Sequence, residues 1–424
     1  MGAASSSITE ALGASNFKFL LGSSIAQAVG GSISSVAVSW LVFHYTGSTL
    51  DIAYVGLTGI VPGIVLGLFA GVLADRYDRR RLMITADVSR MVVMGLLSVL
   101  LYLTGFSLLL ILGVMTLVYS FSALFQPASQ AILPRIVPAG QLESANGLLA
   151  ALSQTGSTVG AGAGGLLIVA AGAVAGFGIN SVTFALSAVL LFQIAASFGR
   201  VEGRAAGSKP SFRREFGEGV DYMRAHPPVL KVTLGFLPGN FLFTMVIGFL
   251  VVYASVLYAG SAAAYGYIEA AFTAGAVVGA LVVPRIRARR FAGLLMALSV
   301  VGQAGAIGLL VVGRSLEVSL AGAVGMGVTL GLINTVYFST MQAIVPNEVL
   351  ARVLSIDMVG SFCAIPAGLV IGGVLAASHG ILFVYAVSTL GLLVNGLLLL
   401  AMKDVRTLRY GGRNPTTLPS GGPE

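Results

Sequence analysis

The stretch Gly71-Val-Leu-Ala-Asp75-Arg76-Tyr-Asp78-Arg79-Arg80-Arg81 carries six charged residues in seven consecutive positions, and long apolar runs flank it. Charge is scarce elsewhere, because Asp, Glu, Lys and Arg make up only 9% of the chain, against about 25% in a soluble domain. A charged cluster between two runs of membrane-spanning length must lie at a membrane face. We therefore predict that this loop joins two transmembrane helices and has a specific role at the helices it joins.

The apolar residues around this loop, 56% of the 424 residues, fall into long runs. Each run is long enough to cross about 30 Å of hydrocarbon as a helix, whereas a transmembrane β-barrel would show short alternating segments. The sequence thus predicts an all-α, multi-pass membrane protein. Twelve spans are expected, at 17–44, 51–73, 82–104, 107–127, 147–170, 174–197, 230–257, 262–283, 291–313, 316–340, 353–377 and 381–402.

The basic residues set the orientation of these spans. With both termini in the cytoplasm, only Arg314 of the 24 Lys and Arg residues falls on the outer side, as the positive-inside bias requires. The net charge of +8 is then explained by the anionic lipid surface that these residues face. We expect a monomeric protein of the cytoplasmic membrane whose charge contacts membrane lipid, with no nucleic-acid partner.

The two halves of the chain repeat at an offset of 208 residues. The repeat predicts two parallel six-helix halves, 1–197 and 229–402, followed by a cytoplasmic tail, 403–424. The linker, 198–228, places apolar residues at helical spacing, which indicates either an amphipathic helix on the membrane surface or a solvated linker helix. The matched pairs include Gly67–Gly275, Gly71–Gly279, Pro138–Pro346, Leu142–Leu350, Gly160–Gly368, Gly164–Gly372, Gly165–Gly373 and Gly172–Gly380.

On these residues the chain resembles the major facilitator superfamily over its whole length, and the charged stretch looks like that family's signature loop between spans two and three. The family pattern has Gly where Asp78 stands. The resemblance implies that the loop holds the cytoplasmic side closed, with Asp75 against the start of span eleven near Arg352. The alternative is that the arginines are orientation signals only. The candidate gating residues are Gly71, Asp75, Arg76, Arg79, Arg80, Arg81, Asp87 and Arg90.

Span five resembles the antiporter motif of the same family, with Ala161 where Pro is usual. The resemblance implies export rather than uptake, and the alternative is ordinary close packing of small residues between helices. Its residues are Gly147, Gly156, Gly160, Gly164 and Gly165. The same span contains the dinucleotide-type pattern Gly160-x-Gly162-x-x-Gly165, which we reject because it follows no strand.

Three further segments resemble the bacterial multidrug, macrolide and enterobactin exporters: 40–48, 126–147 and 218–222. No phosphate-binding loop occurs, so ATP does not drive the chain directly. His44, His226 and His379 are scattered, so we expect no metal site, no cofactor and no catalytic residues. Enzymes and sensors are the alternative class, but the expected clusters or soluble domain are missing from the sequence.

Few ionisable residues lie inside the spans, where each is costly and a functional candidate by default. Glu269 is predicted to carry a coupling proton; the alternative is a water-exposed side chain lining the outer vestibule. Asp87 and Arg90, three residues apart on one helix face, are predicted to form a structural pair rather than to act in transport directly. The acid in span one and the Arg in span four of many proton-coupled relatives are missing here.

Polar and aromatic residues at mid-span depth either bind helices together or line a cavity between the halves. The candidate cavity residues are Gln27, Trp40, Gln154, Asn180, Asn240, Asn334 and Tyr337. A cavity with so few charges suits a lipophilic or amphipathic substrate. We predict a secondary exporter of small molecules of this kind that works by alternating access, with proton antiport as the energy source. A siderophore or other metabolite exporter is the runner-up.

Overall fold

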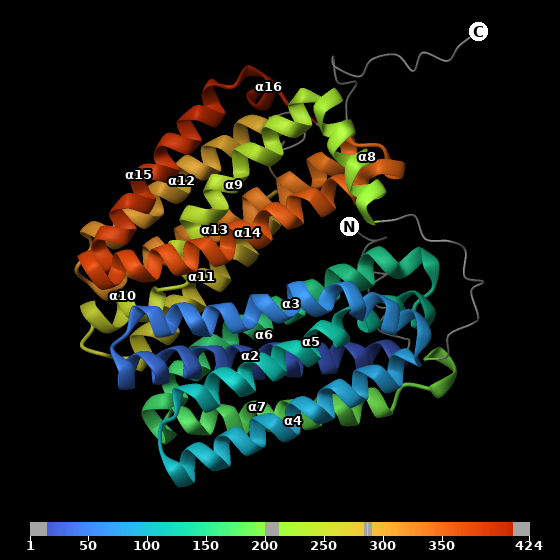
Figure 1. Cartoon of the computed structure of the whole chain (residues 1–424), viewed down its shortest axis with the longest axis vertical. Coiled ribbons are helices and arrows are strands. Elements are labelled where there is room, and N and C mark those ends of the chain that lie inside the picture. Colours follow the sequence, from blue (N-terminus) through green and yellow to red (C-terminus); the bar gives the residue numbers. More distant parts are fainter. Residues whose placement is uncertain (1–14, 200–211, 284–285, 287–290, 410–424) are drawn as a thin grey trace. The chain divides into compact units, whose positions relative to one another are not determined.

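The computed structural model describes residues 15–199, 212–283, 286 and 291–409, which form helices and connecting turns without a strand (Figure 1). Within these ranges the side chains of residues 15, 67–76, 139, 143, 212–215, 347–348 and 351 lie outside the description.

Eleven helices among the described residues are long and apolar enough to cross a membrane. They are α2 (Ser15–Thr46), α3 (Thr49–Arg76), α4 (Arg79–Thr104), α5 (Leu108–Ile136), α7 (Ala173–Phe192), α9 (Pro227–Ile247), α11 (Ala262–Val282), α12 (Ala292–Val312), α13 (Leu316–Ile344), α14 (Asn347–His379) and α15 (Ile381–Ala401). The predicted span 147–170 coincides with α6 (Leu142–Ala171), which is rich in Gly, Ser and Thr and is not among the eleven. The total of twelve spans and the side of the termini therefore stay predictions.

The remaining elements are short. They are η1 (Ala139–Gln141), η2 (Ala196–Phe198), α8 (Phe212–Ala225), α10 (Leu250–Leu257) and α16 (Lys403–Arg406). In the sequence, Pro238-Gly239 predicts a local break of span seven, and the structure contradicts this prediction. Helix α9 continues through Pro238 and ends at Ile247, before a turn at residues 248–249. A membrane helix tolerates an internal Pro, because neighbouring groups satisfy the freed carbonyl.

The repeat recurs in the backbone at the turn that ends the long helices α6 and α14. Gly172 and Gly380 both have a positive φ, 80° and 83°, a conformation that costs a residue without a Cβ little. Each donates its N–H to the carbonyl oxygen four residues earlier, at Ile168 and Ala376. The same offset therefore produces the same helix end twice.

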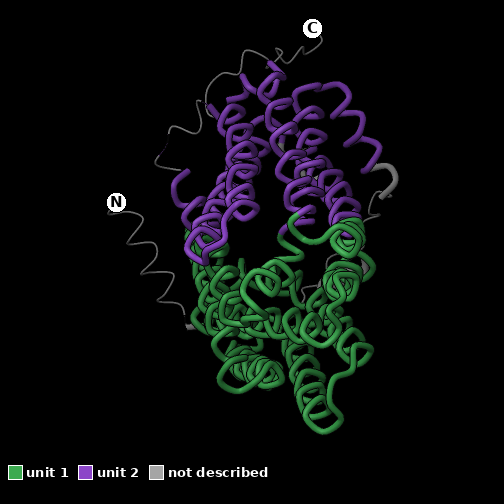
Figure 2. Tube along the Cα trace, turned by 90° about the vertical axis from the view of Figure 1, so that its left-hand side faces the viewer, with its two compact units in different colours: residues 1–205, 247–274, 369–382 green, residues 206–246, 275–368, 383–424 purple. Residues whose placement is uncertain are grey.

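By compactness the chain divides into two units, and Figure 2 colours them separately. Unit 1 comprises residues 1–205, 247–274 and 369–382, and unit 2 comprises 206–246, 275–368 and 383–424. Unit 1 therefore takes in segments of both predicted halves. The predicted domain boundaries stay a prediction of the sequence repeat.

In unit 1, helix α2 packs against α6 and α7, and α4 packs against α5 and α7. Apolar side chains from α2, α4, α5 and α7 form one buried cluster around Phe17, Met83, Phe125 and Leu191. The outward faces of α4, α5 and α7 expose large apolar side chains, including Leu103, Leu109 and Val189. A face of this kind suits lipid better than water.

In unit 2, α8 lies against α14, and the two roles considered for the linker helix stay predictions. Glu218 forms an ion pair with Arg352 at 2.8 Å, and Met223 is buried. A Cβ at Gly219 would come within 2.9 Å of Ile356. Protein thus covers part of the apolar face of α8. Helix α14 begins at Asn347, five residues before Arg352.

Candidate functional site

The charged loop is tied to the helices around it by its second half. Asp78 caps α4, accepting a hydrogen bond from the Arg81 backbone N–H at 2.8 Å. Arg79 donates to the Ala131 carbonyl oxygen on α5. Arg80 donates to the last carbonyl oxygens of α7, at Leu191 and Phe192, where a helix end attracts a cation. These arginines therefore have structural partners besides any part in orientation or gating.

The first half of the loop lies outside the described side chains. Gly71, Asp75 and Arg76 belong to the last turns of α3, but the placement of their side chains is not described. Most of the second copy of the loop, 284–285 and 287–290, also lies outside the described residues. Arg352, which lies near the expected partner region of Asp75 at the start of span eleven, forms an ion pair with Glu218. The gating role of Asp75 stays a prediction.

Asp87 and Arg90 form the predicted pair on α4, and the structure buries it completely. Asp87 is 0% exposed and Arg90 is 4% exposed. Arg90 Nη2 donates to Asp87 Oδ1, and Arg90 Nη1 donates to Ser122 Oγ on α5 at 3.2 Å. The guanidinium also lies over two rings, 4.7 Å from the Phe125 centroid and 4.5 Å from that of Phe184. Two aromatic rings, a carboxylate and a hydroxyl therefore hold the cation.

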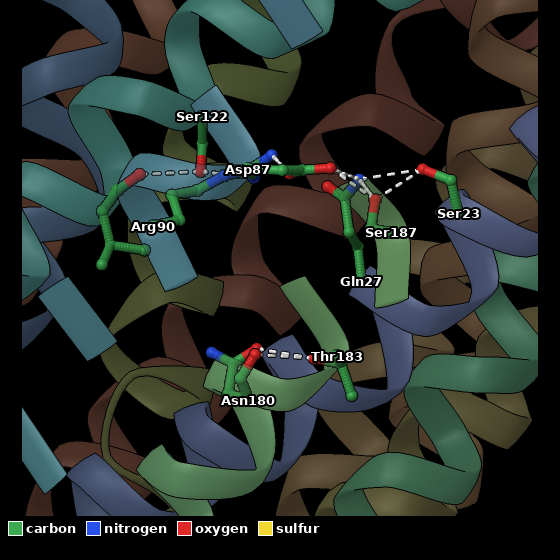
Figure 3. A network of polar contacts seen from close by, with 9 residues as sticks. Ser23, Gln27, Asp87, Arg90, Ser122, Asn180, Thr183 and Ser187 are labelled. Carbon is green, nitrogen blue, oxygen red and sulfur yellow. Dashed lines mark hydrogen bonds and ion pairs between the residues drawn. The ribbon is translucent and has the colours of Figure 1, made fainter. Parts of the chain in front are cut away.

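The other carboxylate oxygen of Asp87 joins a polar network from two further helices (Figure 3). Ser187 on α7 donates to Asp87 Oδ2 at 2.5 Å, and Gln27 Nε2 on α2 lies 3.4 Å from the same oxygen. Gln27 also donates to Ser187 and to Ser23, at 2.8 and 3.2 Å. Both oxygens of the buried carboxylate are thus occupied.

A cavity of about 130 Å³ lies beside this network, between α2, α4, α5 and α7. Two of the residues that line it, Arg90 and Ser34, each have a buried polar atom, Nε and Oγ, without a hydrogen-bond partner among the described residues. Such orphan atoms are costly unless water or a ligand satisfies them. The lining residues are Gln27, Gly31, Ser34, Arg90, Met115, Val118, Tyr119, Ser122, Asn180 and Phe184.

Of the seven predicted cavity residues, the structure brings only Gln27 and Asn180 to this cavity. Trp40 instead donates from Nε1 to the Gly260 carbonyl oxygen at 2.9 Å and stacks on His44. Sequence reasoning missed Ser34, Ser122 and Ser187, because serines are common in these spans. The one available signal was Ser23, which lies four residues before Gln27 on the same helix face.

The other candidates lie on α6 and in unit 2. Asn240 donates to Ser361 Oγ on α14 at 3.2 Å, as expected of a residue that holds two helices together. Tyr337 is buried next to Thr233 and Asp357. Gln154 is half-buried, and Asn334 is exposed.

The glycines of the antiporter-like motif face two different helices. Gly156, Gly160 and Gly164 pack against α2, where added Cβ atoms would meet the backbone near residues 25–33. Gly165 instead meets α11, with an added Cβ 2.7 Å from the Ala262 carbonyl oxygen. Gly147 has open space around it and contributes no close contact.

Glu269 lies on α11 close to this crossing. Its side chain is half-buried, three residues after Gly266 and four after Tyr265. Tyr265 is buried and hydrogen-bonds Ser39 on α2. No group of three or more His, Cys, Asp or Glu side chains in the described parts of the chain could hold a metal ion.

Comparison with known proteins identifies the family. The sequence model of the transmembrane secretion effector family matches residues 6–410. The multidrug efflux pump Tap of Mycolicibacterium fortuitum is 27% identical over 407 residues, covering 92% of this chain and 96% of Tap. Macrolide efflux protein A of Streptococcus pyogenes is 23% identical over 361 residues, covering 82% and 86%.

Among solved structures, the nucleoside transporter NupG has a TM-score of 0.71 at 12% identity, covering 91% of this chain and 98% of NupG. At that identity the likeness shows the major facilitator fold alone. The non-transport alternatives, an enzyme or a sensor, are excluded by the family match. The chain belongs to the transmembrane secretion effector family of the major facilitator superfamily and is a multi-pass efflux transporter of the cell membrane.

Proposed function

We propose that the protein exports small lipophilic or amphipathic molecules from the cytoplasm by alternating access, in exchange for protons. The observation that carries the proposal is the match with the multidrug efflux pump Tap, which covers nearly the whole of both chains. Of the side chains that line the described cavity, only Arg90 is charged, and Asp87 pairs with it. This favours a substrate with few charges.

Contacts inside unit 1 support alternating access. Segments of the second predicted half meet helices of the first at the ends expected to face outward. Gly165 on α6 approaches Gly266 on α11, and Thr49 on α3 donates to the Gly373 carbonyl oxygen at 2.7 Å. Small residues and single hydrogen bonds make a contact that can separate at modest cost. We assign this contact to the closed outer gate.

Glu269 is the proposed carrier of the coupled proton. It lies one turn from the Gly165–Gly266 crossing, so its surroundings change when that crossing separates. A carboxyl that faces water in one state of the transport cycle and protein in the other can exchange a proton with each side of the membrane in turn. Asp75 remains the proposed residue of the cytoplasmic gate.

A metabolite exporter is the second candidate, because one specific observation favours it. The staphyloferrin A transporter of Staphylococcus aureus is 31% identical over 118 residues, or 28% of this chain. That match covers a smaller part of the chain than the match with Tap, so multidrug export ranks first.

The test is a susceptibility and efflux panel in an efflux-deficient bacterial host that expresses the protein. We expect raised resistance to several lipophilic compounds and dye efflux that a protonophore abolishes. Unchanged susceptibility to every compound would contradict multidrug export, and efflux that survives the protonophore would contradict proton coupling. A siderophore-export assay with the same strains decides the second candidate.

A further inference from the structure

The cavity beside Arg90 has no assigned role, and its walls are specific in their chemistry. Arg90 is 4% exposed and Ser34 is 1% exposed. Each has a buried polar atom, Nε and Oγ, without a hydrogen-bond partner among the described residues. Both atoms can donate a hydrogen bond. They come from two helices, α4 and α2, that line the cavity together. The cavity is therefore a built site rather than a packing gap between apolar side chains.

The charge of the site is already balanced. Asp87 accepts from Arg90 through one oxygen and from Ser187 and Gln27 through the other. An anion in the cavity would add a second negative charge next to a single buried cation, at a cost in a low-dielectric interior. A cation would find no free carboxylate oxygen. A neutral acceptor satisfies both donors without changing the charge.

The size of the site limits what it can hold. A volume of about 130 Å³ is close to that of an engineered protein cavity that binds one benzene molecule. A whole drug-sized molecule needs at least about 300 Å³. The cavity therefore suits one polar substituent of a larger molecule.

We propose that this cavity is a subsite for a neutral, oxygen-bearing substituent of the transported molecule, which accepts hydrogen bonds from Arg90 Nε and the Ser34 hydroxyl. The inference rests on the proposed export function and narrows its substrate class. Molecules rich in hydroxyl, ether and carbonyl oxygens use the subsite. Lipophilic ions that carry no acceptor do not.

Two variants remove the subsite in different ways. Ser34→Ala deletes one donor and leaves the space. Gly31→Val adds apolar volume from the lining itself, where no atom lies within 4 Å of an added Cβ. The matched controls are Ser24→Ala, which loses only a bond to the Leu20 carbonyl oxygen on the same helix, and Gly113→Val, at an open and exposed position on α5.

The experiment measures the efflux of two probes from cells: erythromycin, a macrolide rich in oxygen acceptors, and tetraphenylphosphonium, which has none. Loss of one hydrogen bond should lower erythromycin efflux by about threefold to tenfold in Ser34→Ala, and Gly31→Val should lower it at least as much. Tetraphenylphosphonium efflux and both controls should match the wild type. Equal losses for the two probes, or no loss for either, would overturn the subsite.

A second measurement separates the subsite from the export function. If the wild type exports no erythromycin, the proposed function fails for that compound. The subsite is then tested separately, by binding of erythromycin to the purified full-length protein. Erythromycin should raise the unfolding temperature of the wild type and of both controls, but not that of Ser34→Ala or Gly31→Val. No stabilisation of the wild type, or the same stabilisation of all variants, means a cavity that holds water only and overturns the inference.

Discussion

Gly165 on α6 and Gly266 on α11 meet backbone to backbone. A Cβ added at Gly165 would lie 2.9 Å from the Gly266 Cα atom, and one added at Gly266 would lie 2.7 Å from the Gly165 Cα atom. Real Cβ atoms do not come so close to backbone, so any side chain at either position must push the two helices apart. The crossing joins segments that the sequence repeat assigns to different halves.

Gly266→Ala should therefore weaken the proposed outer gate. Overpacking costs about 1–3 kcal/mol, which lowers the population of the closed state by about tenfold for each 1.4 kcal/mol. Efflux should fall accordingly, while the yield of purified protein stays near the wild type. Gly162→Ala on α6 is the control, because its Cβ would meet Ala270 at an ordinary 3.5 Å. Equal losses in both variants would contradict a special role for the crossing.

The buried pair on α4 predicts strong coupling between two substitutions. Asp87→Leu leaves Arg90 charged without its carboxylate, and this should lower the free energy of unfolding by about 3–5 kcal/mol. The double variant, Asp87→Leu with Arg90→Leu, should recover most of that loss, because no uncompensated charge remains. Thermal unfolding of the purified proteins in detergent measures both. A double variant that loses the sum of the two single losses would show that the pair is not coupled.

The signature loop predicts a ranking of variants. Asp75→Asn should leave the protein inserted and purified in normal amounts yet impair transport, because a gate loses its charge. Arg81→Ala should do less, since Arg81 is exposed and only its backbone N–H has a described bond in the loop. Membrane yield and efflux in the same cells measure the two effects separately. Normal efflux by Asp75→Asn would rule out the gating role.

Proton coupling through Glu269 predicts a loss that shape alone cannot explain. Glu269→Gln keeps the size of the side chain but cannot release a proton, so efflux that depends on a proton gradient should be lost. Glu317→Gln, an exposed acid at the start of α13, is the control and should behave as the wild type. The readout is dye efflux with and without an imposed gradient in vesicles. Full gradient-dependent efflux by Glu269→Gln would remove this residue from the mechanism.

Much of the fold was predictable, because length and hydropathy are local properties of a span. The pair Asp87–Arg90 was predictable for the same reason, since a spacing of three residues fixes one helix face. The partners of the pair were not. Ser187 and Ser122 reach it from helices far away in sequence, and only packing brings them together. Pro238 shows the reverse case. The local sequence predicts a helix break there, but the membrane helix α9 continues through it.

The polar network around Asp87 has no copy in the second half of the chain. At the repeat offset, Gly235 stands for Gln27, Leu295 for Asp87, Leu298 for Arg90 and Asn395 for Ser187. If the halves descend from one duplicated gene, one copy has acquired or kept an ionic core that the other lacks. A chain assembled from two first halves would then carry two such cores. Its failure or success would reveal whether export requires asymmetry between the two copies.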